Sequence, residues 1–153
     1  MKIIFGGVIL LAVVSSGSPA HAIARTFVSG TGGGAACTRA APCATFQAAH
    51  DATDSGGEVN CVDGGDFGAV TVAKSITFDC LGIAGATASN FTVNAADLVV
   101  RLRGLIIRNT VSGADGVFST LPGTFHIEYC TVSSTGSAGH GLDFVPNGGA
   151  FRL

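Results

Sequence analysis

Short runs of alternating apolar and polar residues fill the chain from Glu58 onward, separated by turns rich in Gly, Ser, Asn and Asp. Alternation with a period of two residues indicates β-strands. Three runs share one pattern and begin 24 and 25 positions apart, at 76–80, 100–104 and 125–129. A second series of short runs follows at a similar step, at 91–93, 117–118 and 142–144. Recurrence at a fixed spacing indicates a repeat architecture.

A repeat of this length, with two or three short strands, predicts a solenoid in which each coil stacks on the one before it. The register would place Ile76, Val100 and Phe125 in one interior stack, and Phe78, Leu102 and Ile127 in the next. We therefore predict an all-β fold, a right-handed parallel β-helix of about four coils over residues 56–153. The alternative is an antiparallel β-sandwich, which needs no long internal period.

The stretch at 43–53 has the clearest helical pattern, since Phe46, Ala49 and Ala52 or Thr53 fall on one side. The following Ser-Gly-Gly at 55–57 ends it. We expect a short N-terminal capping helix. The predicted organisation is a region at 23–55 with a first strand, a Cys-containing loop and this helix, followed by the β-helix at 56–153.

The first 22 residues have the features of a signal peptide. Lys2 is followed by a 12-residue apolar or glycine run at 3–14, and Ala20-His21-Ala22 has the small-x-small form of a cleavage site. The run is shorter than the roughly 20 residues that span a bilayer. An uncleaved membrane anchor is the alternative. We predict a secreted or periplasmic protein that has no stable membrane insertion after cleavage.

Charge excludes two classes of partner. The net charge is −2 and only 12% of residues are charged. A nucleic-acid binder should show a basic stripe, which the sequence lacks. No run of like charges suggests a polybasic membrane patch.

Export makes disulfides plausible for the five cysteines. We favour Cys37–Cys43, which lie close in one loop, and Cys61–Cys80, which would face each other across neighbouring strands. Two bonds among five cysteines leave 15 connectivities open. Cys130 takes the place of Leu105 one coil earlier, so we expect a buried thiol. No Cys-x-x-Cys or spaced Cys/His set is present, and we predict neither metal nor cofactor.

Several segments resemble one family. The segment 45–61 (TFQAAHDATDSGGEVNC) is similar to the N-terminal cap of pectate-lyase-like right-handed β-helix proteins, and 68–78 (GAVTVAKSITF) resembles the segment that enters their stack. RGLII at 103–107 resembles their coil repeat. Small secreted bacterial β-helix proteins of unassigned function are the most similar. The resemblance implies carbohydrate as the ligand class and an outer sheet face as the site; it implies no particular chemistry.

The predicted outward positions form a dense polar patch. Thr77, Arg101 and His126 would stack on neighbouring strands, and so would Asp79, Arg103 and Glu128. We predict ligand binding by the set Asp79, Arg101, Arg103, His126 and Glu128. The alternative is a cross-strand charge ladder, which favours register and contributes little to stability.

Other polar groups have ordinary explanations. Asp63 and Asp66 suit a turn without any ligand. His140, Asp143 and Ser137 lack the G-x-S-x-G elbow of a Ser-His-Asp hydrolase. Tyr129 is expected to lean inward, so the sequence offers little aromatic surface on which a sugar could stack.

We predict a non-catalytic exported module that binds a polysaccharide or cell-surface polymer. One alternative is a truncated or vestigial carbohydrate-active enzyme, lyase-like or glycoside hydrolase-like; the short loops argue against it and we assign no catalytic residue. Another is a structural element that self-associates end to end, because 151–153 looks like the start of a further strand after 146–150.

Overall fold

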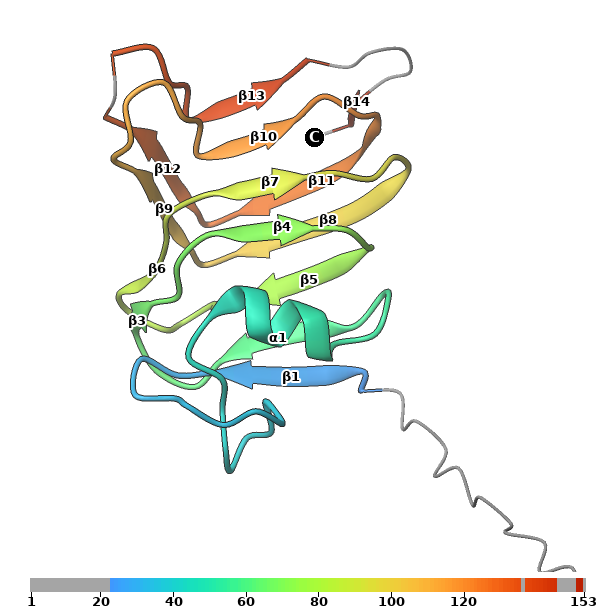
Figure 1. Cartoon of the computed structure of the whole chain (residues 1–153), viewed down its shortest axis with the longest axis vertical. Helices are drawn as coiled ribbons and strands as arrows, with labels where there is room; N and C mark the ends of the chain where they lie inside the picture. Colours follow the sequence, from blue (N-terminus) through green and yellow to red (C-terminus); the bar gives the residue numbers. More distant parts are fainter. Residues whose placement is uncertain (1–22, 136, 146–150, 153) are drawn as a thin grey trace, which may run out of the picture.

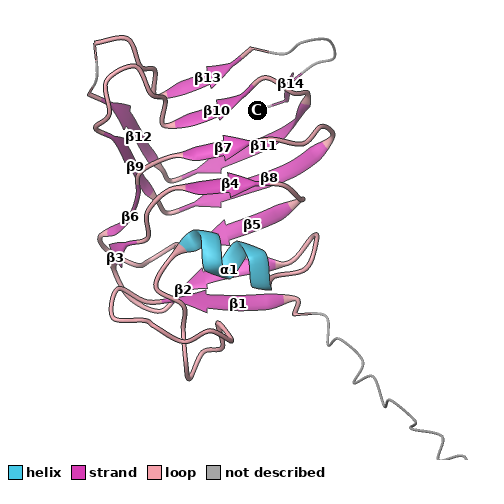
Figure 2. Cartoon of the chain, viewed as in Figure 1, coloured by secondary structure: helices cyan, strands magenta, loops and turns pink. Residues whose placement is uncertain are grey.

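The computed structural model describes residues 23–135, 137–145 and 151–152. The predicted signal peptide at 1–22 and the segment 146–150 lie outside the described residues. The described chain forms a parallel β-solenoid of about three turns with a single short helix (Figure 1). Figure 2 shows the strands stacked in layers, with the helix beside the first of them.

The strands of the described residues fall into three parallel sheets. Sheet A has the order β1 (Arg25–Val28), β2 (Glu58–Cys61), β5 (Ile76–Asp79), β8 (Leu98–Arg103), β11 (Gly123–Glu128) and β14 (Phe151–Arg152). Sheet B has the order β3 (Gly65–Asp66), β6 (Ala86–Ala88), β9 (Ile106–Asn109) and β12 (Thr131–Ser134). Sheet C has the order β4 (Val70–Val72), β7 (Phe91–Val93), β10 (Val117–Ser119) and β13 (Leu142–Phe144).

The predicted register is confirmed in sheet A. Val100 of β8 pairs with Ile76 of β5 and with Phe125 of β11, and these three side chains are buried in one stack. Leu102 pairs with Phe78 and with Ile127 in the same way. The second predicted series forms sheet C, with Val117 paired to Phe91 and to Leu142.

The expected number of coils was too high. Sheets B and C contain four strands each among the described residues, so three repeats separate the first strand from the last. Dividing the length by the period overcounts, because among the described residues the last repeat contributes only β14 of sheet A, which is two residues long. The pattern also failed to single out β3 and β6, whose small residues carry little strand signal.

The helix α1 (Phe46–Ala52) is shorter than the predicted 43–53. Thr45 is its N-cap and accepts a hydrogen bond from the Ala48 amide, which satisfies one of the free N–H groups of the first turn. Cys43 belongs instead to the preceding loop, where its backbone forms an isolated β-bridge with Val28 of β1. Within the described part of the chain, no helix has the length and apolar character needed to cross a membrane.

Phe46 of α1 closes one end of the apolar interior. Its ring lies 4.8 Å from that of Phe67, 5.1 Å from Phe78 and 5.9 Å from Phe91, centroid to centroid. All four rings are fully buried. The helix therefore takes the place that a further strand of sheet C would occupy below β4.

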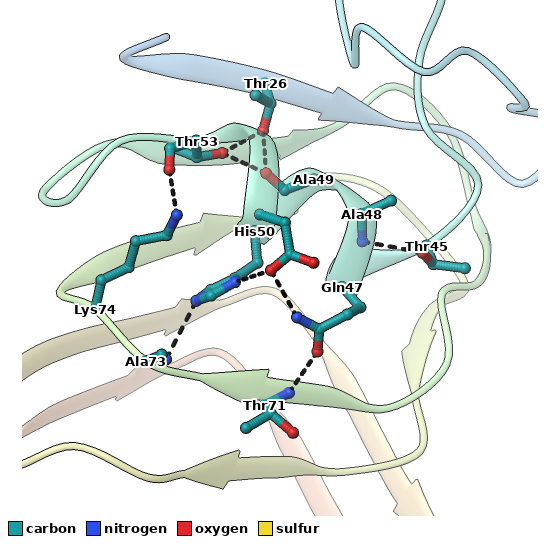
Figure 3. Close-up of polar contacts among 11 residues, drawn as sticks. Thr26, Thr45, Gln47, Ala48, Ala49, His50, Thr53, Thr71, Ala73 and Lys74 are labelled. Carbon is teal, nitrogen blue, oxygen red and sulfur yellow. Dashed lines mark hydrogen bonds and ion pairs between the residues drawn. The ribbon is translucent and has the colours of Figure 1, made fainter. Parts of the chain in front are cut away.

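Side chains of α1 also bind the free edge of β4 (Figure 3). The Thr71 amide donates to Gln47 Oε1 at 2.8 Å, and the Ala73 amide donates to His50 Nε2 at 3.3 Å. The other ring nitrogen of the buried His50 lies 2.8 Å from Asp51 Oδ1. That hydrogen bond is the main cause that lowers the pKa of Asp51 below its usual value. An unpaired strand edge is thus satisfied by a helix.

Both favoured cysteine pairs are bonded in the structure. Cys37 and Cys43 have a Cα–Cα distance of 4.6 Å, and Cys61 and Cys80 one of 4.9 Å. Cys130 is free and half-buried against the core. Burial raises the pKa of its thiol above the usual value, so the thiol is the favoured form at neutral pH.

Candidate functional site

The outer face of sheet A carries the predicted polar residues in two columns. Register places Thr77 beside Arg101 and Arg101 beside His126. It also places Asp79 beside Arg103 and Arg103 beside Glu128. Because side chains alternate along each strand, all six point away from the interior stacks.

The second column is a charge ladder. Arg103 donates to Asp79 Oδ2 at 2.6 Å and to Glu128 Oε2 at 3.2 Å. Asp79 is the main cause that raises the pKa of Arg103 above its usual value, so this guanidinium stays charged. The ladder holds three strands in register, and both of its carboxylates already have a partner.

The first column differs, because its cations beyond Arg25 lack carboxylate partners. Arg25 at its N-terminal end pairs with Glu58 at 3.4 Å. Within the described residues, Arg101 and His126 form no ion pair, and Arg152 of β14 forms none either. Arg152 pairs in register with Thr124, two residues before His126, so it lies on the same outer face. Three successive strands thus present unpaired basic side chains.

An open hollow of about 360 Å³ adjoins this face near the N-terminal strands. Its lining joins apolar and polar side chains: Phe27, Arg39, Glu58, Asn60, Cys61, Asp79, Leu81 and Ile83. The Arg39 guanidinium lies 5.8 Å from the centroid of the Phe27 ring. The Cys37–Cys43 disulfide closes the loop that carries Arg39, so it helps to position this residue over β1.

Sequence reasoning missed Phe27 and Arg39, and it misplaced Tyr129. The outward position of Phe27 could have been predicted from the sequence, since Phe27 lies between Thr26 and Val28, which are both buried. The path of the loop at 37–43 is what brings Arg39 to it, and no periodicity predicts that path. Tyr129 is 82% exposed at a corner where its φ is 54°, so the expectation that it leans inward was wrong.

The two aspartates predicted to lie in turns have local partners. Asp63 accepts hydrogen bonds from the Ser29 hydroxyl at 2.8 Å and from the Gly30 amide at 2.7 Å. Asp66 accepts one from the Gly68 amide at 3.0 Å. These bonds account for both carboxylates without a ligand, in line with the simpler interpretation of the sequence. Asp63 lies in the turn before β3, as expected, whereas Asp66 is the second residue of β3.

Asp143 lies in β13 of sheet C and His140 in the turn before it, away from the candidate face on sheet A. Ser137 is within 3.3 Å of the Ser112 hydroxyl, and no hydrogen bond joins it to His140 in the described part of the chain. The imidazole is instead close to Asp115, a residue that the sequence reading did not single out.

The protein is a parallel β-solenoid whose sheet A has a polar outer face, and this face does not by itself indicate a reaction. Comparisons with protein-family models, with curated proteins and with solved structures found no match for this chain.

Proposed function

We propose that this protein is an exported, non-catalytic module that binds a polysaccharide or similar cell-surface polymer along the outer face of sheet A. The observation that carries the proposal is the set of basic side chains without carboxylate partners, Arg101, His126 and Arg152, on three neighbouring strands. Guanidinium groups recognise carboxylates and similar anionic groups through paired N–H donors. An acidic polymer is therefore the favoured ligand.

The shape of the face supports an extended ligand. Neighbouring strands lie about 4.8 Å apart, so side chains in one column form a regular row that suits a repeating chain. The hollow beside Phe27 and Asn60 continues this row toward the N-terminal strands. Resemblance of the cap and coil segments to pectate-lyase-like proteins agrees with a carbohydrate ligand, and the solenoid fold agrees with that resemblance.

Export rests on the N-terminal sequence and is supported by the two disulfides, which persist in oxidising compartments. Mass spectrometry of the protein secreted by its host should find a chain that begins at Ile23. A chain retaining residues 1–22 would contradict cleavage.

Binding can be tested with a panel of acidic and neutral polysaccharides. Arg101→Ala should weaken binding to an acidic member about tenfold, the effect of losing roughly 1.4 kcal/mol, and added salt should weaken it further. Arg108→Ala is the matched control, since it removes the same charge from an exposed position on sheet B. Equal effects of the two substitutions would overturn the proposal.

The same panel separates the enzymatic alternative. Release of unsaturated or reducing ends from a polyuronate, abolished by Arg103→Ala, would favour a carbohydrate-active enzyme over a binding module. Binding without turnover supports the module.

A further inference from the structure

A cluster of metal-ligating groups lies on sheet C, outside the candidate face. His140 Nδ1 is 3.3 Å from Asp115 Oδ1 and 3.9 Å from Asp143 Oδ2. All three potential ligand atoms lie within 4.8 Å of one another. We propose that Asp115, His140 and Asp143 bind a divalent first-row transition-metal ion such as Zn²⁺.

The backbone assembles this cluster from two coils. The Gly116 amide donates to the His140 carbonyl at 2.9 Å, and the Val117 amide donates to the Gly141 carbonyl at 2.9 Å. A Cβ atom on Gly139 would lie 2.2 Å from the Ala114 carbonyl oxygen, so the two turns pack backbone against backbone. Asp115 and His140 therefore occupy equivalent positions in successive coils, 25 residues apart.

Charge balance favours a cation here. Two carboxylates face one imidazole, and neither carboxylate pairs with a lysine or arginine among the described residues. A neutral imidazole can donate only one ring N–H, so it cannot compensate both acids. Asp115 is held in place because its Oδ1 also accepts the His140 amide at 2.7 Å.

The donor set and spacing select the class of ion. Bonds of about 2.0–2.2 Å in tetrahedral geometry place neighbouring ligand atoms about 3.3–3.6 Å apart. The 3.3 Å separation fits, and the 3.9 Å separation would have to shorten when an ion binds; the third separation, between Asp115 and Asp143, is at most 4.8 Å. Imidazole with two carboxylates suits Zn²⁺ or its neighbours, whereas Ca²⁺ prefers six to eight oxygen ligands. Three protein ligands leave coordination positions open to water or to a further ligand.

A bound ion would join β10 and β13 through the turns before them. Asp115 precedes β10, His140 precedes β13, and Asp143 lies within β13. The register position of Asp143 is occupied by Phe118, Thr92 and Thr71 in the three preceding strands of sheet C. These residues offer no carboxylate or imidazole, so the site is confined to the last two coils. Zinc should therefore raise the unfolding temperature as well as bind.

The test is calorimetric titration of Zn²⁺ into the purified protein carrying Cys130→Ser, which removes a competing thiol. We expect one ion per chain and a zinc-dependent rise in Tm. His140→Gln and Asp143→Asn should each weaken binding at least about tenfold, and the double variant about 100-fold. Asp54→Asn, at an exposed position after α1, is the matched control for Asp143→Asn and should bind zinc normally.

Three results would overturn the proposal: no zinc binding at millimolar concentration, unchanged binding by the double variant, or Ca²⁺ binding as tight as Zn²⁺ binding. His140 is 68% exposed, so its substitution should leave the fold intact, and circular dichroism checks this. The rise in Tm must disappear in the same variants that lose binding.

Discussion

The N-terminal end of the stack holds four phenylalanine rings that are fully buried, whereas the described residues of the C-terminal coils include a ring pair of which one member is half-buried. That pair is Phe125 and Phe144, with centroids 4.6 Å apart. Both disulfides lie before residue 81, and the free Cys130 lies after it. Stability should therefore be graded along the solenoid, with the N-terminal coils opening last.

The largest expected effect comes from the buried cluster. Phe46→Ala should lower the free energy of unfolding by about 3–5 kcal/mol, because it opens a cavity where three other rings meet. Phe144→Ala is the matched change at the other end and should cost less, since that ring is half-buried. Urea denaturation of both variants measures the difference. Equal costs would show that the two ends are equally packed.

Next in size is the Cys61–Cys80 disulfide. Replacing both cysteines by serine should cost about 3 kcal/mol, because the bond closes a loop with a sequence separation of 19. The Cys37–Cys43 pair, with a separation of 6, should cost less. Cys130→Ser serves as control and should change little. Calorimetry of the three variants tests this order, and the reverse order would contradict it.

A smaller effect is expected at the helix that covers β4. Gln47→Leu should cost about 1 kcal/mol, because the Thr71 amide loses its acceptor. Gln47→Glu keeps the acceptor for Thr71 but replaces the Nε2 donor to Asp51 Oδ1 by a carboxylate, so it should restore only part of the loss. Hydrogen exchange of the Thr71 amide provides the local measurement. No change in its exchange rate would mean that the helix does not protect this edge.

The smallest effect concerns Cys130 and pH. Burial raises the pKa of its thiol in the folded protein. Its contribution to stability is therefore full below the unfolded-state pKa, about 8.5, and is lost as pH rises through the folded value. Unfolding of the parent protein should become easier above that range than unfolding of Cys130→Ser. Iodoacetamide should also react more slowly with the folded than with the unfolded chain, and equal rates at equal pH would contradict the shift.

The sequence allowed the stacking to be predicted because a strict period of 24–25 residues leaves one register for 76–79, 100–103 and 125–128. It did not allow the corner at Leu81 to be placed. Leu81 follows the strand 76–79 at the same offset at which Leu105 follows 100–103, yet Leu81 is exposed and Cys80 is the buried residue there. The connection there is longer: six residues (80–85) separate β5 from β6, whereas two (104–105) separate β8 from β9, and Cys80 is bonded to Cys61.

For the candidate site, alternation along the strands predicted which side chains face outward. It also predicted the charge ladder, because the alternative interpretation placed Arg103 between Asp79 and Glu128 and the structure pairs Arg103 with both. Arg101 and Arg103 have the same type and lie two residues apart, but only Arg103 has carboxylates on both neighbouring strands. Asp115 escaped notice because its partner His140 is one full coil away, and ligand motifs are usually sought at short spacing.

The covering of the N-terminal edge gives the molecule a direction. Helix α1 occupies the edge of sheet C, the loop at 37–43 hydrogen-bonds along β1 of sheet A, and Gly30 packs on Gly65 of sheet B. Within the described residues, the strand edges at this end are thus covered and are not open for pairing with a strand of another molecule. Any lengthening of the stack, by further chain or by a second molecule, is therefore expected at the opposite end, away from α1.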